Sequence, residues 1–190
     1  MEITDLIEKN NIYCDPNNNL LPYTGNIKGK VFGKIIKGKL EGEFIEYYDN
    51  GNISSVVNYS NNQLTGEYKD YFNNGIIKEQ GTVCANKWDG KYSNYYDNGQ
   101  IREEKIYSKG ILNGKSNFYY NNGKIKEVKN FLNGKLEGNY FSYYNSGQVW
   151  IKSIYKDGKL EGRREIYFIH GSLEKTEFYK NGIKTGKPLH

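Results

Sequence analysis

The side chains that most often carry out chemistry in proteins are scarce in this 190-residue chain, which contains 2 His and 2 Cys. His170 precedes a glycine in a segment typical of a turn, and His190 is the last residue, so the histidines do not have the spacing of a metal site or of a nucleophile and its base. Cys14 and Cys84 lie far apart with no second pair, which predicts two free thiols rather than a disulfide framework or a zinc site. We therefore expect no cofactor and no metal.

Acid–base chemistry and phosphate binding are also poorly supported by the sequence. Glu103 and Glu104 are neighbours on a predicted strand, so their side chains point to opposite faces and cannot act together on one substrate. Cys84 lies beside a predicted turn without a His partner, which favours a structural thiol over a nucleophile. No glycine-rich stretch has the strand-to-helix context of a phosphate-binding loop. We predict that the chain is not an enzyme and has no small-molecule substrate.

The composition favours strands and tight turns. The hydrophobic fraction is 36% and includes 19 Tyr, and 22 Gly stand against 3 Pro. A net charge of +5 is mildly basic and suits acidic surfaces without indicating dedicated nucleic-acid binding. The first residues are acidic and lack the apolar core of a secretory signal. We expect a cytoplasmic protein if the chain is complete, and an exported or cell-surface protein if a signal peptide was removed.

A 24-residue period organises the chain. The phrase Y-Y-D-N-G-N-I at residues 47–53 returns in five later variants, one in each 24-residue step. Three columns of glycine, or of asparagine in its place, share this period. The first column is Gly42, Gly66, Gly90, Gly114, Gly138, Gly162 and Gly186. The second is Gly51, Gly75, Gly99, Gly123, Gly147 and Gly171. The third is Gly38, Asn62, Asn86, Gly110, Gly134, Gly158 and Gly182.

The second and third columns predict hairpin turns. Dipeptides such as Asn50-Gly51 and Asn133-Gly134 are typical of two-residue type I′ loops, which need positive φ at both positions. Each repeat then has two strands and two turns, and the turns fix the pairing of the strands. The predicted pairs in the first repeat are Tyr48 with Ile53, Tyr47 with Ser54 and Ile45 with Val56, and then Tyr59 with Leu64 across the second turn.

This register sorts the side chains onto two faces of a sheet. One face carries two apolar ridges, represented by Tyr48 with Ile53 and by Tyr59 with Leu64, and the first glycine column runs between them. A glycine inside a strand signals a bend, so we expect the sheet to fold there and bring the ridges together as a thin core. The alternative is an open trough that receives a partner.

The other face carries a tyrosine column from Tyr47 to Tyr167. From Tyr71 to Tyr143 the predicted register places Lys, Arg or Trp beside each ring, whereas Ser54 and Glu174 stand beside the first and last tyrosines. Such a ladder either stiffens a single-layer sheet or forms a surface for an anionic lipid or nucleic acid. The candidate partner-binding residues are Tyr71, Lys78, Tyr95, Arg102, Tyr119, Lys126, Tyr143 and Trp150.

The repeats and the chain before them form two predicted regions. Residues 1–37 are expected to be an N-terminal cap with a short helical turn, in which Asp5 and Glu8 form a capping box, and with a half repeat in P-Y-T-G at 22–25. Residues 38–187 hold six 24-residue repeats and a C-terminal stub. The predicted fold is all-β: an elongated antiparallel β-meander of hairpin repeats, in a single twisted sheet bent at the glycine column.

Segments such as K-L-E-G-E-F-I-E-Y-Y-D-N-G and K-L-E-G-N-Y-F-S-Y-Y-N-S-G, together with P-Y-T-G, resemble the bacterial variant of the MORN repeat over about residues 22–187. The resemblance implies a sheet of hairpins used for protein association, and for contact with membrane lipids in some eukaryotic members. Many bacterial members carry an antitoxin label. Where the eukaryotic pattern has Trp two residues after the glycine, this chain has Phe44, Tyr68, Tyr92, Ser116, Tyr140 and Arg164.

We therefore predict a non-enzymatic protein-interaction scaffold built of MORN-like repeats. Two alternatives stay open at this point: a binder of anionic lipid or nucleic acid through the Tyr/Lys/Arg ladder, and the antitoxin of a toxin–antitoxin pair. A protein partner is expected first. We expect a monomer, with a dimer as the alternative if the apolar ridges stay open.

Overall fold

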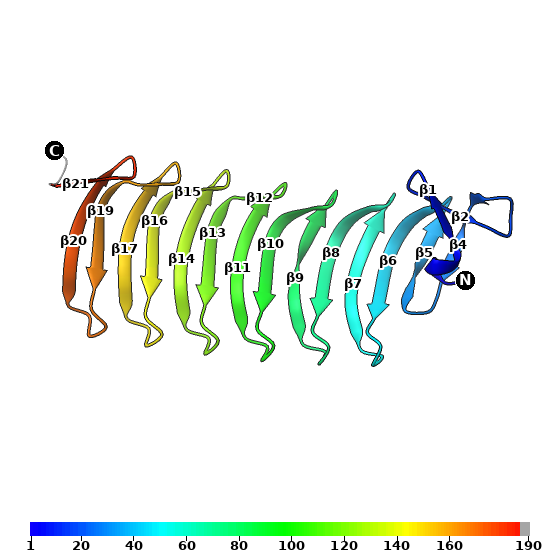
Figure 1. Cartoon of the computed structure of the whole chain (residues 1–190), viewed down its shortest axis with the longest axis horizontal. Coiled ribbons are helices and arrows are strands. Elements are labelled where there is room, and N and C mark those ends of the chain that lie inside the picture. Colours follow the sequence, from blue (N-terminus) through cyan, green and yellow to red (C-terminus); the bar gives the residue numbers. More distant parts are fainter. Residues whose placement is uncertain (187–190) are drawn as a thin grey trace. The chain divides into compact units, whose positions relative to one another are not determined.

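The computed structural model describes residues 1–186, which form two compact units that divide after Gly90. Regular structure in both units consists of antiparallel strands, and a single turn of 3-10 helix, η1 (Ile3–Asp5), lies near the start (Figure 1). The predicted all-β meander of hairpin repeats is confirmed. The proposed Asp5–Glu8 capping box is wrong, because Asp5 instead accepts from the backbone N–H of Glu2 (2.8 Å) and the chain enters a strand at Ile7.

The first unit joins a small cap sheet to the first repeats. The cap sheet contains β1 (Ile7–Lys9), β2 (Ile12–Asp15) and β3 (Leu21–Pro22), in that order. The following strands are β4 (Gly25–Ile27), β5 (Val31–Ile36), β6 (Lys39–Tyr47), β7 (Ile53–Ser60), β8 (Gln63–Tyr71) and β9 (Ile77–Cys84), and from β5 on each pairs with the strand before it. Strand β10 (Lys87–Tyr95) contains the division between the units.

The second unit repeats one motif: a long strand, a two-residue strand after a tight turn, and a six-residue strand. The first two motifs are β11 (Ile101–Ser108), β12 (Ile111–Leu112), β13 (Gly114–Tyr119), β14 (Ile125–Leu132), β15 (Lys135–Leu136) and β16 (Gly138–Tyr143). The rest are β17 (Val149–Lys156), β18 (Lys159–Leu160), β19 (Gly162–Tyr167), β20 (Leu173–Lys180) and β21 (Ile183–Thr185). All pairings within this unit are antiparallel.

The turns of the third glycine column have the predicted type I′ geometry. Both central residues have positive φ, as at Asn61 (53°) with Asn62 (67°) and at Asn133 (50°) with Gly134 (80°). The register beyond them is also as predicted, since Tyr59 pairs with Leu64. Two successive residues in the left-handed region therefore form this turn in every repeat, including Lys109 with Gly110.

The turns of the second glycine column differ from the prediction. Only the glycine has positive φ, as at Gly51 (85°), and Asn50 is not among the residues with positive φ. The Asn50 side-chain oxygen instead accepts from the N–H of Asn52 (3.0 Å), and the N–H of Tyr48 donates to the Asn52 carbonyl (2.8 Å). This is a three-residue loop that ends in a glycine bulge, because the asparagine side chain completes the turn in place of the backbone.

The extra loop residue shifts the register near these turns by one. Ile45 pairs with Val56 as predicted, but Tyr47 pairs with Ile53 rather than with Ser54, and the strands bulge between Glu46 and Tyr47. Similar bulges follow in β8, β13, β16 and β19. The predicted pairing of Tyr48 with Ile53 is wrong for the same reason.

The first glycine column bends the strands, as predicted. From Gly42 to Gly162 the φ values of this column lie between 76° at Gly162 and 123° at Gly114, a region that side chains with a Cβ rarely adopt. In the second unit, each of these glycines follows one residue that interrupts the strand, as Asn113 does between β12 and β13. The strands of the repeats curve near these positions (Figure 1).

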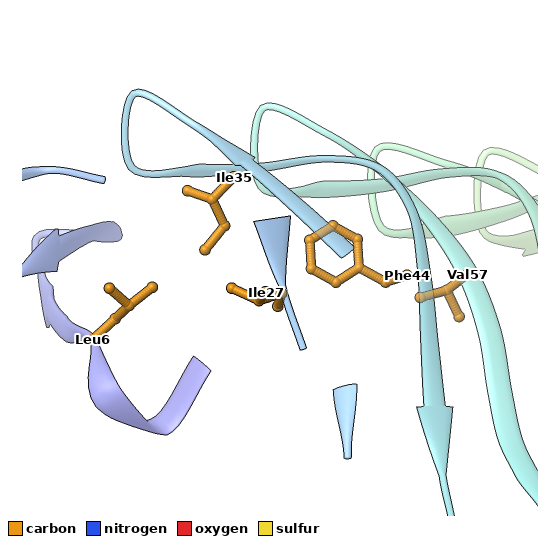
Figure 2. Close-up of a cluster of buried hydrophobic side chains, with 5 residues drawn as sticks. All are labelled: Leu6, Ile27, Ile35, Phe44 and Val57. Carbon is orange, nitrogen blue, oxygen red and sulfur yellow. The ribbon is translucent and has the colours of Figure 1, made fainter. Parts of the chain in front are cut away.

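The hydrophobic core lies in the first unit. Leu6 of the cap, Ile27, Ile35, Phe44 and Val57 are all at most 9% exposed and converge on one another (Figure 2). Their position corrects the predicted core of two ridges. The ridge near the second turn takes part, since Tyr59 and Leu64 pack against the cluster, but the ridge near the first turn stays exposed at Ile53, Phe168 and Leu173.

The core also uses a position that belongs to neither predicted ridge. This position lies two residues after each glycine of the first column, as Phe44 does after Gly42. We call these residues, with the residues that face them, the inner row. In the first unit the inner row pairs Phe44 with Val57 and Tyr68 with Gly81. In the second unit it pairs Ser116 with Lys129, Tyr140 with Ser153 and Arg164 with Glu177.

Candidate functional site

The predicted ladder residues occupy one place in each repeat, beside the glycine-bulge turns. The tyrosine rings are half-buried, whereas the cations and Trp150 are exposed. The bulges place Lys78, Lys126 and Trp150 outside the strand pairing, and the tyrosines pair instead with aliphatic residues: Tyr71 with Ile77, Tyr119 with Ile125 and Tyr143 with Val149. The predicted ladder of direct Tyr–cation pairs is therefore wrong, because it depended on two-residue turns.

The ladder cations contact a different tyrosine column, one residue further along. The guanidinium of Arg102 lies 6.0 Å from the centre of the Tyr96 ring, and the Lys126 ammonium lies 5.7 Å from the Tyr120 ring. Trp150 continues this series, with its ring centre 5.6 Å from that of Tyr144. Cations over aromatic rings at exposed sites contribute about 0.5–1 kcal/mol each.

Lys78 is the exception, since its ammonium forms an ion pair with Asp70 (2.9 Å). This pair raises the pKa of Lys78, first through the hydrogen bond to the Asp70 carboxylate. The exposed ladder thus has different partners in the two units: a carboxylate in the first unit and aromatic faces in the second.

The second tyrosine column also connects successive repeats. The hydroxyl of Tyr48 donates to the backbone carbonyl of Tyr71 (2.6 Å), and that of Tyr120 donates to the carbonyl of Tyr143 (2.7 Å). Tyr96 and Tyr144 make the same bond at 2.8 and 2.9 Å. The carbonyls of the ladder tyrosines thus accept structural hydrogen bonds, so this part of the predicted site stabilises the contact between neighbouring repeats. Tyr at the second position of the Y-Y pair is the sequence signal for it, because the bond uses that hydroxyl and a backbone carbonyl of the next repeat.

An exposed apolar surface lies on the outer face of the second unit, opposite the inner row. Along β17, Ile151 and Ser153 are 9% and 5% exposed, whereas Trp150 and Ile154 are 43% and 44% exposed. Successive side chains of a regular strand alternate between faces, so Ile154 lies on the outer face, and Trp150, at the bulge, is exposed next to the nearly buried Ile151. Ile106 on β11 is equally open, at 43%. Of these, only Trp150 was among the predicted site residues.

Two shallow hollows open on this outer face. Hollow A, about 330 Å³, is lined by Lys91, Glu104, Lys105, Ile106, Lys115 and Asn117. Hollow B, about 220 Å³, is lined by Asn139, Phe141, Lys152, Ser153, Ile154, Arg163 and Glu165. Both lie within the second unit, and their isoleucines are separated by two repeats.

Hydrogen bonds fix the carboxylate in each hollow. Glu104 pairs with Lys91 (2.8 Å) and accepts from the Tyr119 hydroxyl (2.7 Å). These two bonds, the one from Lys91 foremost, lower the pKa of Glu104. Burial and the bond to Glu104 raise the pKa of Tyr119 to about 12. In hollow B, Glu165 pairs with Arg163 (2.7 Å) and accepts from the Tyr167 hydroxyl (2.7 Å). The lowered pKa keeps Glu104 ionised, so this carboxylate lacks the proton that acid catalysis needs.

The lysines of the inner row in the second unit contact aromatic rings and carboxylates. The ammonium of Lys129 lies 4.7 Å from the centre of the Phe118 ring and forms an ion pair with Glu127 (2.9 Å). The Lys105 ammonium lies 5.6 Å from the centre of the same Phe118 ring and forms an ion pair with Glu103 (2.9 Å). These lysines occupy the region around Ser116, where two neighbouring repeats have Tyr92 and Tyr140.

One further concavity, of about 570 Å³, lies in the first unit between the cap and the second turns, and side-chain amides dominate its lining. Several of these amides hold the turns themselves. Asn62 accepts from the N–H of Leu40 (2.6 Å) and donates to the Asn11 carbonyl (2.6 Å), and Asn86 accepts from the N–H of Leu64 (2.8 Å). The amides therefore have a structural role in joining the cap to the repeats.

The remaining candidates for chemistry stay apart in the structure. Within residues 1–186, no three His, Cys, Asp or Glu side chains are grouped so as to hold a metal ion. Cys14 is buried and Cys84 is exposed, and both are free thiols, as predicted. The His170 ring stacks on Phe168 in its turn. Among the same residues, no helix is long and apolar enough to cross a membrane.

Five stretches of the chain match the family model for the MORN repeat variant: residues 40–61, 64–84, 88–109, 112–133 and 136–157. Together they cover more than half of the chain, and each begins at the second-turn hairpin of the structure. No curated protein matches the sequence. MORN repeats are commonly involved in protein or membrane interactions, and the family is generally non-enzymatic. The chain belongs to the MORN repeat variant family.

Proposed function

We propose that this MORN repeat protein is a non-enzymatic scaffold that binds another protein through the outer face of its second unit. The observation that carries the proposal is the contrast along β17, where Trp150 and Ile154 are 43% and 44% exposed beside nearly buried neighbours. A strand that turns a Trp and an Ile to the surface leaves apolar area that a partner would cover.

The composition of the outer face supports a protein partner. Trp, Tyr and Arg dominate the binding energy of protein interfaces, and the β17–β19 region combines Trp150, Tyr167 and Arg163 with Ile154. The Lys152 ammonium lies 5.2 Å from the centre of the Tyr167 ring, so its charge is already placed over an aromatic surface. Rigid aromatic side chains on paired strands lose little conformational entropy on binding.

The test is capture of a protein partner from the native host with the wild-type chain and with Trp150→Ser/Ile154→Ser. Leu132→Ser is the matched control, because Leu132 is 53% exposed at the end of β14, where it lines neither hollow. We expect a discrete partner that the wild type and the control recover and the double variant loses. Recovery of no protein by the correctly folded wild type would reject the scaffold function.

Repeating the binding measurement at rising salt and with a charge variant separates this function from binding of anionic lipid or nucleic acid. Arg102 and Lys126 are exposed beside their tyrosine rings, which favours an electrostatic surface of that kind. Binding through these cations should weaken steeply as salt rises and should disappear in Lys78→Ser/Arg102→Ser/Lys126→Ser. An apolar protein interface should keep most of its affinity under both changes.

A further inference from the structure

The two hollows on the outer face of the second unit are related by the repeat. Each has one isoleucine, Ile106 in hollow A and Ile154 in hollow B, at positions 48 residues apart. Each also has one cation on the adjacent six-residue strand, Lys115 on β13 and Arg163 on β19. The same combination of an isoleucine and a cation thus occurs twice in the second unit, whose strands β11 to β19 follow one another in Figure 1.

The repeat between the hollows closes the corresponding position. Asn130 stands where Ile106 and Ile154 stand in the flanking repeats, and its amide donates to the backbone carbonyl of Asn139 (2.8 Å). The neighbouring outer-face residue Val128 is only 9% exposed. An apolar side chain of a partner can therefore bind beside Ile106 and beside Ile154, but not beside Asn130 in the repeat between them.

The spacing of the hollows fits a short stretch of extended chain. Four strand-to-strand steps separate them, from β11 through β13, β14 and β16 to β17. At roughly 4.8 Å per step the distance is about 19 Å, which an extended chain at about 3.3 Å per residue covers in about six residues. An even number of residues keeps both side chains on the same side of the extended chain.

The charge of the outer face selects an acidic segment. Cations outnumber carboxylates on it, and the two carboxylates in the hollows are already engaged with Lys91 and Arg163. The outer-face cations, assigned by alternation along the regular parts of the strands, are Lys91, Lys115, Lys152, Lys156, Arg163 and Lys180, and the carboxylates are Glu104 and Glu165. Acidic residues between the two apolar ones would complement this excess.

We propose that the two hollows receive two apolar side chains, about six residues apart, from one extended acidic segment of a protein partner. The proposal rests on the scaffold function and adds the chemistry and spacing of what is bound. The isoleucines contact the apolar side chains. The cations next to them in the same row, Lys115 beside Ile106 and Arg163 beside Ile154, contact the acidic residues.

The test uses two synthetic peptides of identical composition, made of Glu and Ser with two Leu. One peptide has the leucines about six residues apart, and in its isomer one leucine is moved by one residue, to the opposite side of the extended chain. Fluorescence anisotropy with the full chain at moderate salt measures both affinities. We expect the first peptide to bind at least about tenfold more tightly, because the isomer can fill only one hollow.

Variants of the full chain locate the binding. Ile106→Ser and Ile154→Ser should each reduce the affinity for the first peptide to about that of the isomer. Ile183→Ser is the matched control, because Ile183 is 72% exposed on β21 outside both hollows, and it should leave binding unchanged. Circular dichroism of each variant shows whether the fold is kept, and a peptide bearing one Leu keeps the comparison valid if a variant is unstable.

The outcomes separate this proposal from the scaffold function. Equal binding of the two peptides, absence of binding, or binding that Ile106→Ser and Ile154→Ser leave unchanged would overturn the two-hollow proposal. Equal binding that vanishes at high salt would overturn it in favour of a cationic surface that attracts any acidic chain. In all these cases the scaffold function stands if the wild-type chain still captures a protein that Trp150→Ser/Ile154→Ser loses.

Discussion

The inner rows of the two units have the same place in the repeat and opposite chemistry. In the first unit, Phe44 and Val57 are 3% and 6% exposed within an apolar cluster that includes Leu6 of the cap. In the second unit, the pair at the corresponding position is Ser116 with Lys129, and the lysine lies over an aromatic ring instead of packing against an apolar partner. The backbone pairing around both is the same antiparallel ladder.

The comparison shows which parts of the repeat are fixed. Tight turns, glycine bulges and the tyrosine hydroxyl bonds recur in both units and satisfy the backbone without help from the inner row. The inner row is therefore free to be apolar or charged, so long as each charge has a partner. In the first unit the row is a core sealed by the cap, and in the second unit it is a line of ion pairs and cation–ring contacts.

The largest effect is expected from a substitution in the apolar inner row of the first unit. Phe44→Ala should destabilise the protein by about 3–5 kcal/mol, because a nearly buried ring is lost and a cavity remains next to Val57 and Ile35. Tyr140→Ala, at the same place in a later repeat, should cost less, since its ring is half-buried. Urea unfolding followed by circular dichroism measures both. A loss at Tyr140 as large as that at Phe44 would mean that the second unit also has an apolar core.

The next prediction concerns the bend, which the units share. Gly114→Val should cost about 2 kcal/mol or more, because a β-branched residue cannot adopt a φ of 123° without strain. An added Cβ would also lie 3.3 Å from the Ile106 side chain. Gly66→Val in the first unit should be similarly costly, since φ there is 77°. Lys115→Val is the control, and a melting temperature equal to that of Gly114→Val would contradict the bend.

The third prediction uses the charges that distinguish the second unit. Glu177, 6% exposed, accepts from Lys175 (2.7 Å), Lys184 (2.7 Å) and Arg164 (3.3 Å). These contacts, the bond from Lys175 foremost, lower its pKa to about 2. The folded-state pKa lies below the unfolded value of about 4.3, so its contribution is complete above that value and is lost as the pH falls toward 2.

Hydrogen exchange at pH 6 and pH 3 should therefore show β19 and β20 losing protection on acidification, while β6 and β7 in the apolar row keep theirs. Glu177→Gln should reduce protection of β19 and β20 at pH 6 and leave little further change at pH 3. If both units lost protection equally in the wild-type protein, the acid sensitivity would not come from the inner row of the second unit.

Much of this architecture follows from the sequence because its signals are local. The period, the type I′ turns and the bend depend on glycine and asparagine at fixed positions, where the backbone conformation decides the residue type. The first-turn register was mispredicted because Asn50-Gly51 is compatible with both a two-residue and a three-residue loop. The asparagine side chain's own hydrogen bond to Asn52 decides between them.

The inner row and the hollows could not be predicted in the same way. Phe44, Ser116 and Arg164 share one column of the repeat but differ in type, so no periodic signal marks the column as buried. The spacing of hollows A and B reflects Asn130, which stands between Ile106 and Ile154 and donates a hydrogen bond to a neighbouring strand. Contacts of this kind arise only after the register is set, and the predicted register was displaced by one residue near the turns.

The smallest expected effect tests how well the polar row is satisfied. The Ser116 hydroxyl is buried without a hydrogen-bond partner, and the side chain is 1% exposed. A buried hydroxyl without a partner costs free energy that its removal recovers, so Ser116→Ala should stabilise the protein by up to about 1 kcal/mol. Ser55, 8% exposed in the first unit, is not among the unpartnered groups, and Ser55→Ala should give no gain. Thermal unfolding at matched pH and salt resolves the difference. If Ser116→Ala instead lowers the melting temperature, the hydroxyl is bonded in solution, and the inner row of the second unit is a fully satisfied polar network.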